Sequence, residues 1–313
     1  MIYDEVKFGG RDEMVNMPPG LVDWREGLYL SHIAREDYQG HGEIVDAGSF
    51  LGASAWALSH GLRQNAGLFA KAGRVHAFDQ FNAWDEPSMT KEQTASWIRR
   101  TFAADVDERG GFLNAFFRNL GDHIEHVTIH EGPLEQARWC GAPVDILFID
   151  AGKTISAWQA ILANFYSCLV EGRSIVVQQD WHHAWLPHIV VTQEAFSPYF
   201  EVLESRISDT ASFRYVSTVS AALLRKAVAW DFSADEQICL MNQAVSRFAS
   251  YGREAFVQLA AVELLRSLGR IDDARKALLA LRPAPSAFSD EAQFDRFCRS
   301  RSDIAKALGD PSP

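Results

Sequence analysis

The chain has 313 residues, of which 47% are hydrophobic and 23% charged, and its formal net charge is −11 at pH 7. This length supports a full hydrophobic core, with one large domain and an appendage. A negative net charge opposes binding to the phosphate backbone of nucleic acids, and the longest basic cluster is only Arg99-Arg100, or Arg299 with Arg301. We therefore expect a small-molecule partner and no nucleic acid.

The sequence indicates a cytoplasmic protein without a membrane partner. No window reaches the roughly 18 consecutive apolar residues that span a bilayer, and the first residues, MIYDEVKFGGRDEM, hold no apolar signal core. The cysteines are widely spaced and form no metal-ligand pattern, so we expect reduced thiols. They are Cys140, Cys168, Cys239 and Cys298.

Three zones follow one another along the chain. Residues 1–40 carry an amphipathic run, Trp24–Tyr38, which predicts an N-terminal helical cap. Residues 41–228 alternate apolar runs with helical patterns and predict the main domain. Residues 229–313 contain no convincing strand and predict a helical extension.

The main domain is predicted to be α/β. Its apolar, β-branched runs alternate with helical patterns such as Ser54–Ala70 and Thr154–Leu169, which is typical of a sheet buried on both faces. The expected strands are Glu43–Ala47, Arg74–Phe78, His126–His130, Val144–Ile149, Arg173–Gln178, Phe200–Glu204 and Tyr215–Leu224. The short connection Ser205–Arg214 predicts an antiparallel hairpin at one edge. The fold class is therefore a Rossmann-like, doubly wound, mostly parallel seven-stranded sheet with an antiparallel edge hairpin.

A long connection and the tail add two further features. Residues 82–125 carry helical patterns at Lys91–Ala104 and Phe112–Leu120, and they form either a substrate lid or a plain structural insertion. In the tail, Ala255–Leu281 resembles one tetratricopeptide-type helical hairpin. A single hairpin does not make a solenoid. We expect it to pack on the main domain or on a second copy, in a homo-oligomer; docking of another protein is the alternative.

The stretch after the first strand reads Asp46-Ala47-Gly48-Ser49-Phe50-Leu51-Gly52-Ala53-Ser54. Gly48 permits a tight turn, Gly52 lets a helix start close to the strand, and that helix presents free amides. A dinucleotide loop would carry glycine where Phe50 stands. The spacing instead resembles the methyltransferase pattern, in which the glycine turn holds the methionine part of S-adenosylmethionine. Asp46 would attract its ammonium, with Ser49 and Ser54 beside it.

A second acid strengthens this interpretation. Asp79 ends the second strand, 33 residues after Asp46, and an acid at this place can accept hydrogen bonds from both ribose hydroxyls. The stretch FDQFNAWDEP, 78–87, is similar to the corresponding stretch of macrocin-type O-methyltransferases, which methylate sugar hydroxyls. HEGPLEQA, 130–137, and residues 144–181 resemble later segments of that family. The resemblance implies that Gln80 joins Asp79, and that Glu131 and Gly132 border the adenine.

The same resemblance implies a magnesium ion. In that family, an aspartate after strand four and two acids after strand five hold it, and the matching residues here are Asp150, Gln179 and Asp180. Glutamine replaces one carboxylate, and Gly152 stands where a further acid is common. The alternative is that Asp150 and Asp180 act as base and hydrogen-bond acceptor without metal, with Asp150 also bordering the donor.

A histidine pair supplies a candidate base, since imidazole can remove a proton from a hydroxyl. Of His182 and His183 we favour His182, because it is nearest to Asp180. His130 is a weaker candidate. Trp181 could stack on a sugar or belong to the core, and Trp185 fits the core better.

Together these residues predict an S-adenosylmethionine-dependent O-methyltransferase that acts on a hydroxyl of a sugar or another small molecule. Asp150 or His182 would take the proton, and Asp180 would fix the acceptor directly or through the metal. The alternatives are a nicotinamide oxidoreductase, which Phe50 disfavours, a catalytically inactive binding or scaffold protein of the same fold, and a metal-dependent methyltransferase of another acceptor class, such as a catechol.

Overall fold

The computed structural model describes residues 8–85, 89–251, 254–282, 288 and 291–309. Contacts divide the chain into two compact units. Within the described residues, unit A comprises residues 8–151 and Ala163–Val170, and unit B comprises Gly152–Leu162 and the residues from Glu171 onward. The described residues of the predicted helical extension, 229–313, fall in the same unit as residues 171–228 of the predicted main domain.

A seven-stranded mixed sheet confirms the predicted fold class, with the strand order β3-β2-β1-β4-β5-β7-β6. The strands are β1 (Glu43–Ala47), β2 (Val75–Asp79), β3 (Val127–Glu131), β4 (Val144–Ile149), β5 (Ile175–Gln178), β6 (Phe200–Ile207) and β7 (Thr210–Tyr215). In unit A, β1 pairs in parallel with β2 and β4, and β2 pairs in parallel with β3. In unit B, β7 pairs antiparallel with both β5 and β6, so the edge hairpin is present.

The register of unit A places the ends of its strands at one edge. Asp79 of β2 lies opposite Glu131 of β3, and Ala47 of β1 lies opposite Ile149 of β4. Because parallel strands all end at the same edge, the acids that follow or end these strands gather there. This arrangement positions the site described below.

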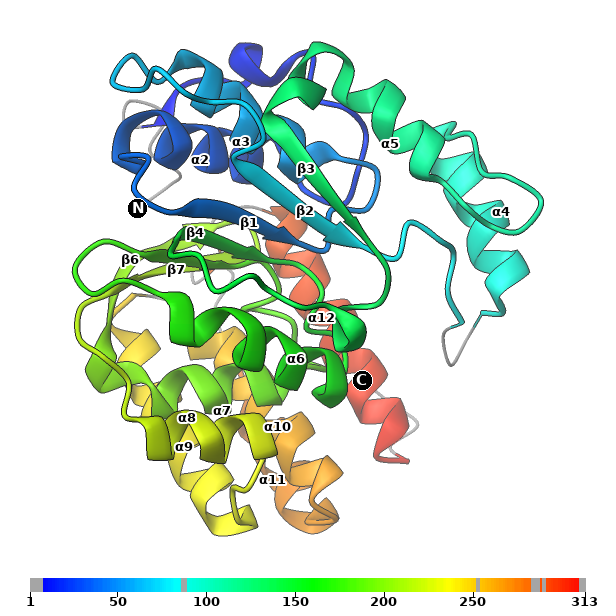
Figure 1. Ribbon diagram of the computed structural model, residues 1–313. Helices are drawn as coiled ribbons and strands as arrows, with labels where there is room; N and C mark the ends of the chain where they lie inside the picture. Colours follow the sequence, from blue (N-terminus) through cyan, green and yellow to red (C-terminus); the bar gives the residue numbers. More distant parts are fainter. Residues whose placement is uncertain (1–7, 86–88, 252–253, 283–287, 289–290, 310–313) are drawn as a thin grey trace. The chain divides into compact units, whose positions relative to one another are not determined.

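Helices flank the strands in each unit. Those of unit A are α2 (Trp24–His32), α3 (Ala53–Gln64), α4 (Lys91–Phe102) and α5 (Leu113–Leu120), with short helical turns at Arg11–Met14, Ile33–Asp37, Gly121–His126, Leu134–Gln136 and Tyr166–Cys168. Those of unit B are α7 (Pro187–Ala195), α8 (Ala221–Ala229), α9 (Ala234–Ala249), α10 (Glu254–Ser267), α11 (Ile271–Ala280) and α12 (Glu291–Ala307), with a turn at Ser197–Tyr199. Helix α6 (Ile155–Phe165) runs across the division. Figure 1 shows α2 and α3 packed together beside β1, β2 and β3.

Local sequence explains where several helices begin. Asp23 accepts hydrogen bonds from the amides of Arg25 and Glu26, and the Glu26 side chain returns a bond to Asp23, which is a capping box before α2. Thr90 and Gln93 form the same arrangement before α4. Such caps satisfy the free amides of a first turn, so these starts could be read from the sequence.

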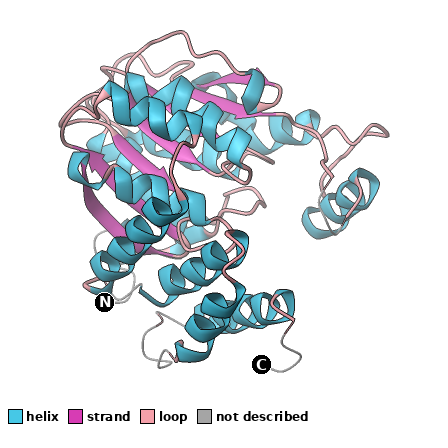
Figure 2. Cartoon of the chain, turned by 90° about the horizontal axis from the view of Figure 1, so that it is seen from below, coloured by secondary structure: helices cyan, strands magenta, loops and turns pink. Residues whose placement is uncertain are grey.

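The insertion between β2 and β3 holds α4 and α5, as the sequence predicts. Long loops join α4 to the rest of unit A (Figures 1 and 2), and residues 86–88 lie outside the described part. Arg99 of α4 donates hydrogen bonds to the carbonyls of Val106 and Asp107, which ties the loop after α4 to the helix. The structure shows no movement, so the lid role remains a prediction.

The last predicted strand, Tyr215–Leu224, is wrong. The strand is Thr210–Tyr215, and Ala221–Ala229 is helix α8. Ser220 caps that helix through the amide of Leu223, and its run of alanine, leucine, arginine and lysine has high helix propensity. The preceding segment, TASFRY, alternates as a strand should, although β-propensity alone does not set it apart from its neighbours.

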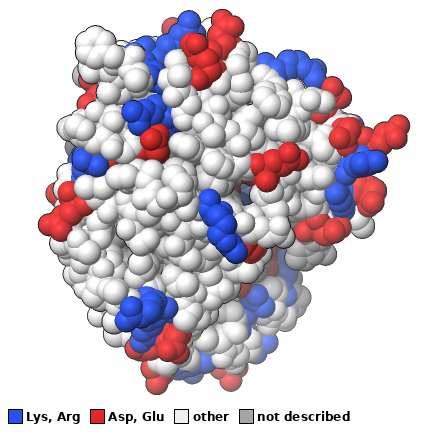
Figure 3. Space-filling model, in the orientation of Figure 1, with Lys and Arg blue, Asp and Glu red and all other residues white. Residues whose placement is uncertain are grey.

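The tail hairpin is present as α10 and α11, which meet at residues 268–270. Their apolar faces join α12 in a core within unit B that includes Phe256, Leu259, Phe288 and Phe297. Among the described residues, no helix is both long and apolar enough to cross a membrane. On the face drawn in Figure 3, Lys and Arg side chains are scattered among Asp and Glu and form no large basic patch.

Candidate active site

The turn between β1 and α3 has the backbone geometry that its glycines predict. Gly48 has φ 103° and Gly52 has φ 96°, values that favour glycine. A Cβ on Gly48 would lie 2.6 Å from the carbonyl oxygen of Asp150. Phe50, between them, also adopts a positive φ of 45°. The turn is therefore tight, and Gly48 brings the backbone close to the loop after β4.

Asp46 is a buried acid at the centre of this turn, with no exposed surface. Its Oδ2 accepts a hydrogen bond of 3.0 Å from the Ser54 hydroxyl, and the Ser49 hydroxyl donates to its backbone carbonyl at 3.2 Å. Within the described part of the chain, Oδ1 is buried without a hydrogen-bond partner. Burial raises the pKa of Asp46 to about 7, and the charges of Asp150 and Asp79 add to the shift. A positively charged ligand would satisfy this oxygen.

Asp79 ends β2 and binds the backbone of two neighbouring segments. It accepts hydrogen bonds from the amide of Phe50 at 2.9 Å and from that of Phe81 at 2.7 Å. Burial raises the pKa of Asp79, while these amide bonds oppose the shift. Each carboxylate oxygen has a second lone pair, so Asp79 can hold the turn in place and still accept a ligand hydroxyl.

The other residues predicted to bind the donor in unit A lie beside these two acids. The amide of Gly132 donates to the carbonyl of Asp79 at 2.9 Å, and Gly132 has φ 136°. Gln80 and Glu131 are exposed at the ends of β2 and β3. The structure thus brings together the predicted donor-binding residues that lie within unit A.

The space next to the glycine turn is narrow. Gly20, Leu21 and Val22 line it opposite Gly48–Ser54 and Asp150, and the cavity between them is about 10 Å³. That volume barely holds a water molecule. A ligand that contacts Gly48 from this side must therefore displace residues 20–22. The sequence patterns gave no indication of this covering segment.

Aromatic side chains form a wall beside the same turn. The ring of Phe50 lies 5.3 Å from that of Phe112, 5.4 Å from Phe102 and 6.1 Å from Trp84, all edge to face. Phe102 and Phe112 belong to the insertion, so the insertion packs against the turn. This contact would couple the predicted lid to the donor site.

In unit B, Asp180 follows β5 and forms an ion pair with Lys153. The Asp180 side chain is 8% exposed and that of Lys153 is 49% exposed, so the lysine covers the acid. The exposed His183 lies near both charges; the surrounding protein lowers the pKa of His183, while Asp180 opposes the shift. The sequence did not single out Lys153, and it offered His183 only as the less favoured member of the pair with His182.

The residues predicted to hold magnesium do not fit a metal ion. Of the three, Asp150 supplies one carboxylate, Gln179 supplies no charge, and Asp180 is paired with an ammonium. In the described part of the chain, no three His, Cys, Asp or Glu residues form a group that could hold a metal. Mg²⁺ is normally held by carboxylate oxygens. The reaction proposed below therefore has no step through a metal.

The predicted base His182 and the nearby aromatic residues pack inside unit B. His182 is 4% exposed, and its ring centroid lies 5.3 Å from that of Phe256 in α10. Trp181 is 1% exposed, so its ring has no face for a sugar. Trp185 packs against the core of the tail helices, as expected. These positions favour packing roles for all three residues.

The other histidine candidate, His130, lies in the sheet of unit A. Its ring stacks on Phe78 with centroids 4.1 Å apart, and its Nε2 lies 2.9 Å from Nδ1 of His76. Burial lowers the pKa of His130. These contacts indicate a structural role.

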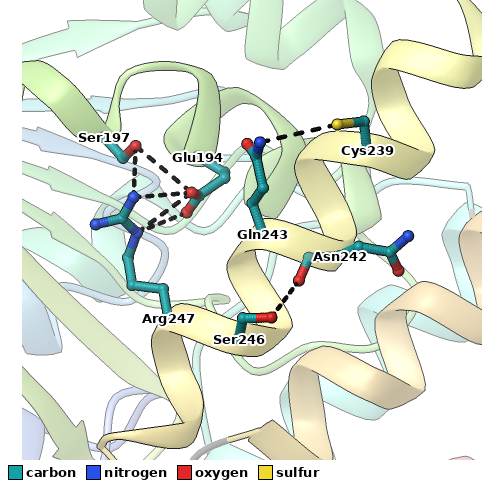
Figure 4. Close-up of a pocket in the computed structure, with 7 residues that line it drawn as sticks. All are labelled: Glu194, Ser197, Cys239, Asn242, Gln243, Ser246 and Arg247. Carbon is teal, nitrogen blue, oxygen red and sulfur yellow. Dashed lines mark hydrogen bonds and ion pairs between the residues drawn. The ribbon is translucent and has the colours of Figure 1, made fainter.

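A cavity of about 740 Å³ opens between α7 and α9 in unit B. Figure 4 shows Arg247 reaching across it to Glu194 and Ser197, and Gln243 bonding to Cys239. Glu194 is 4% exposed and its oxygens lie 3.0–3.2 Å from the guanidinium. This ion pair joins two helices, which is a structural role.

One known family matches part of the chain. Residues 45–181 match the model of a family described as a methyltransferase domain. The match covers 137 of the 313 residues. The match begins inside β1 and ends at Trp181, so it includes the glycine turn, Asp79, Asp150 and Asp180. No curated protein matches the chain with significance.

Solved structures with a related fold include methyltransferases. The O-methyltransferase NovP is 15% identical, with a TM-score of 0.47, over 66% of this chain and 88% of its own. CalS11, a calicheamicin methyltransferase, is 16% identical, with a TM-score of 0.47, over 66% of this chain and 86% of its own. Its apo structure, described as a TDP-rhamnose 3'-O-methyltransferase, is 16% identical, with a TM-score of 0.43, over 66% and 87%.

Proposed function

We propose that the methyltransferase domain uses S-adenosylmethionine to methylate a hydroxyl of a sugar or another small molecule. The observation that carries the proposal is Asp46 at the Gly48 turn. A buried carboxylate oxygen without a partner, beside a glycine whose Cβ would strike the next loop, suits the ammonium of an amino acid that lies close to the backbone.

Each predicted donor contact has a place in this proposal. Asp46 and the turn hold the amino acid end of the donor, through Gly48, Ser49, Gly52 and Ser54. Asp79 and Gln80 accept the ribose hydroxyls, and Glu131 and Gly132 border the adenine. Asp150, whose charge already acts on Asp46, lies beside the sulfonium end.

The donor would supply a methyl group. As the acceptor oxygen forms its bond to the methyl carbon, the bond between that carbon and sulfur breaks, and its electron pair stays on sulfur. The sulfonium is already a good leaving group, so the residues of this chain mainly align the acceptor and take its proton. Asp150 in unit A and Asp180 in unit B are the carboxylates proposed for these tasks. His182 is a weaker candidate because its ring is buried against Phe256.

One observation supports a sugar as the acceptor, and a second disfavours nucleic acids. The stretches 78–87 and 130–137 are similar to macrocin-type sugar O-methyltransferases. The net charge of −11 disfavours nucleic acids as acceptors. We also propose a homo-oligomer, which light scattering checks directly.

The proposal is tested by calorimetry with S-adenosylmethionine and, separately, with NAD. We expect binding of the first and none of the second. Release of adenosylhomocysteine is then measured with a panel of sugars and catechols. Tight NAD binding without S-adenosylmethionine binding would contradict the proposal. Donor binding without turnover on any acceptor would favour the inactive binding protein instead.

A further inference from the structure

The loops after β4 and β5 of this chain offer few of the ligands that a divalent cation requires, although Asp150 directly follows β4. Gly152 provides no side chain, Gln179 provides no charge, and Asp180 is already paired with Lys153. We propose that the ammonium of Lys153 stands in place of the metal, and that methyl transfer by this protein needs no divalent cation. The inference rests on the proposed function.

The loop that carries Lys153 is fixed by buried neighbours in unit B. Nε2 of His188 donates a hydrogen bond of 2.8 Å to the carbonyl oxygen of Gly152, and His188 is 6% exposed. The residue before Lys153 is thus anchored to α7. This anchor places the start of the lysine side chain, which then reaches Asp180.

The indole of Trp158 restricts the side chains that position 152 can carry. A Cβ on Gly152 would lie 3.0 Å from the Trp158 ring, which is fully buried and donates a hydrogen bond of 3.0 Å to Thr192. An acid at position 152 would push against this fixed ring. The packing of α6 against α7 therefore disfavours a carboxylate side chain at position 152.

The charges around Asp180 favour an ammonium over an added cation. Lys153 pairs with the carboxylate directly, and its charge also acts on the neighbouring His183. A divalent ion would have to displace Lys153, with Asp180 as its only acid from the loop after β5. The ammonium avoids that cost because it is attached to the chain.

In the proposed role, Lys153 acts on the acceptor oxygen. Its ammonium donates a hydrogen bond to that oxygen and stabilises the negative charge that develops as the O–H proton leaves to the Asp180 carboxylate. A fixed positive charge near a developing oxyanion performs the electrostatic part of the task that a metal performs elsewhere.

The test measures metal binding apart from turnover. Mn²⁺ is titrated into the full-length protein and followed by electron paramagnetic resonance, with and without S-adenosylmethionine. We expect no bound Mn²⁺ at millimolar concentration, and methyl transfer that is unchanged by EDTA. Mn²⁺ bound at micromolar concentration, or transfer that EDTA abolishes and Mg²⁺ restores, overturns the inference.

Variants of Lys153 test its chemical role. Lys153→Met keeps the length of the side chain and removes its charge, so it should lower kcat about 100-fold. Donor affinity should change less than about threefold, because neither Lys153 nor Asp180 is among the residues proposed to hold the donor. Lys153→Arg retains the charge and should recover part of the rate. Lys306→Met, which removes an exposed lysine paired with Asp303 in α12, is the matched control. A wild-type rate in Lys153→Met overturns the role of Lys153.

The outcomes separate this inference from the proposed function. If the protein does not bind S-adenosylmethionine, the proposed function fails, and the Mn²⁺ titration still decides whether the loops hold a metal. If the donor binds and Mn²⁺ also binds tightly, the proposed function stands and the inference fails. If Lys153→Met does not fold, Lys153→Arg and the titration of the unmodified protein decide the question.

Discussion

Replacing Asp46 with asparagine should stabilise the protein at neutral and alkaline pH. Asparagine has the same shape and can accept the Ser54 hydrogen bond, but it carries no charge. Burial, with help from Asp150 and Asp79, raises the pKa of Asp46 from 3.8 to about 7. That difference corresponds to about 4 kcal/mol, at about 1.36 kcal/mol for each pKa unit.

The direction of the pH effect follows from the raised pKa. The folded protein holds the proton on Asp46 more tightly than the unfolded chain does. The contribution of Asp46 to stability is therefore complete below pH 3.8 and is lost as the pH rises through about 7. Asparagine does not titrate, so the variant should become increasingly more stable than the natural protein as the pH rises over this range.

Thermal unfolding followed by circular dichroism measures the effect. The melting temperatures of Asp46→Asn and the unmodified protein should be similar near pH 4.5 and should differ by on the order of 10 °C at pH 8. Asp272→Asn, which removes an acid with an 87% exposed side chain, is the control and should show no such divergence. A difference between Asp46→Asn and the natural protein that stays constant with pH would refute the reasoning. The same variant should lose donor binding.

Three further outcomes are expected. A cationic donor binds the ionised form of Asp46, whose pKa is about 7, so donor affinity should fall about tenfold for each pH unit below 7. Calorimetry between pH 5 and 8 measures this affinity, and an affinity that does not change with pH argues against Asp46 as the ligand. Gly48→Ala should abolish donor binding because its Cβ would lie 2.6 Å from the Asp150 carbonyl, whereas Gly10→Ala, with no atom within 4 Å, should leave binding intact. Glu194→Ala should lower the free energy of unfolding by about 2 kcal/mol because it leaves Arg247 without its partner across the cavity; urea unfolding checks this, and donor affinity should not change.

The parts of the fold that follow local rules could be predicted. β1 and β4 have the predicted bounds, Glu43–Ala47 and Val144–Ile149, because each is a short apolar run that a sheet buries on both faces. The glycine turn was also predictable, since positive φ at Gly48 and Gly52 is a property of those residues. The strand predicted at Tyr215–Leu224 was wrong because the end of β7 and the start of the capped helix α8 both lie within that segment.

The features that the sequence did not reveal depend on packing between distant segments. Residues 20–22 cover the glycine turn, although nothing in their composition marks them as neighbours of β1. The sequence also did not indicate a role for Lys153. It lies three residues after Asp150, but only the fold shows that it pairs with Asp180, because the hydrogen bond from His188 fixes the loop after β4. Side-chain partners that are far apart in sequence require the structure.

Two of the buried acids, Asp46 and Asp180, differ in a way that bears on what each can bind. Asp46 has a hydrogen bond from Ser54 and, within the described residues, no ion pair, so its ionised form lacks a counter-charge. Asp180 has its counter-charge in Lys153. A buried carboxylate without a cation is stabilised when a cationic ligand binds to it. A carboxylate that is already paired must first lose its partner. The same electrostatic rule therefore favours a cationic methyl donor at Asp46 and disfavours a metal ion at Asp180.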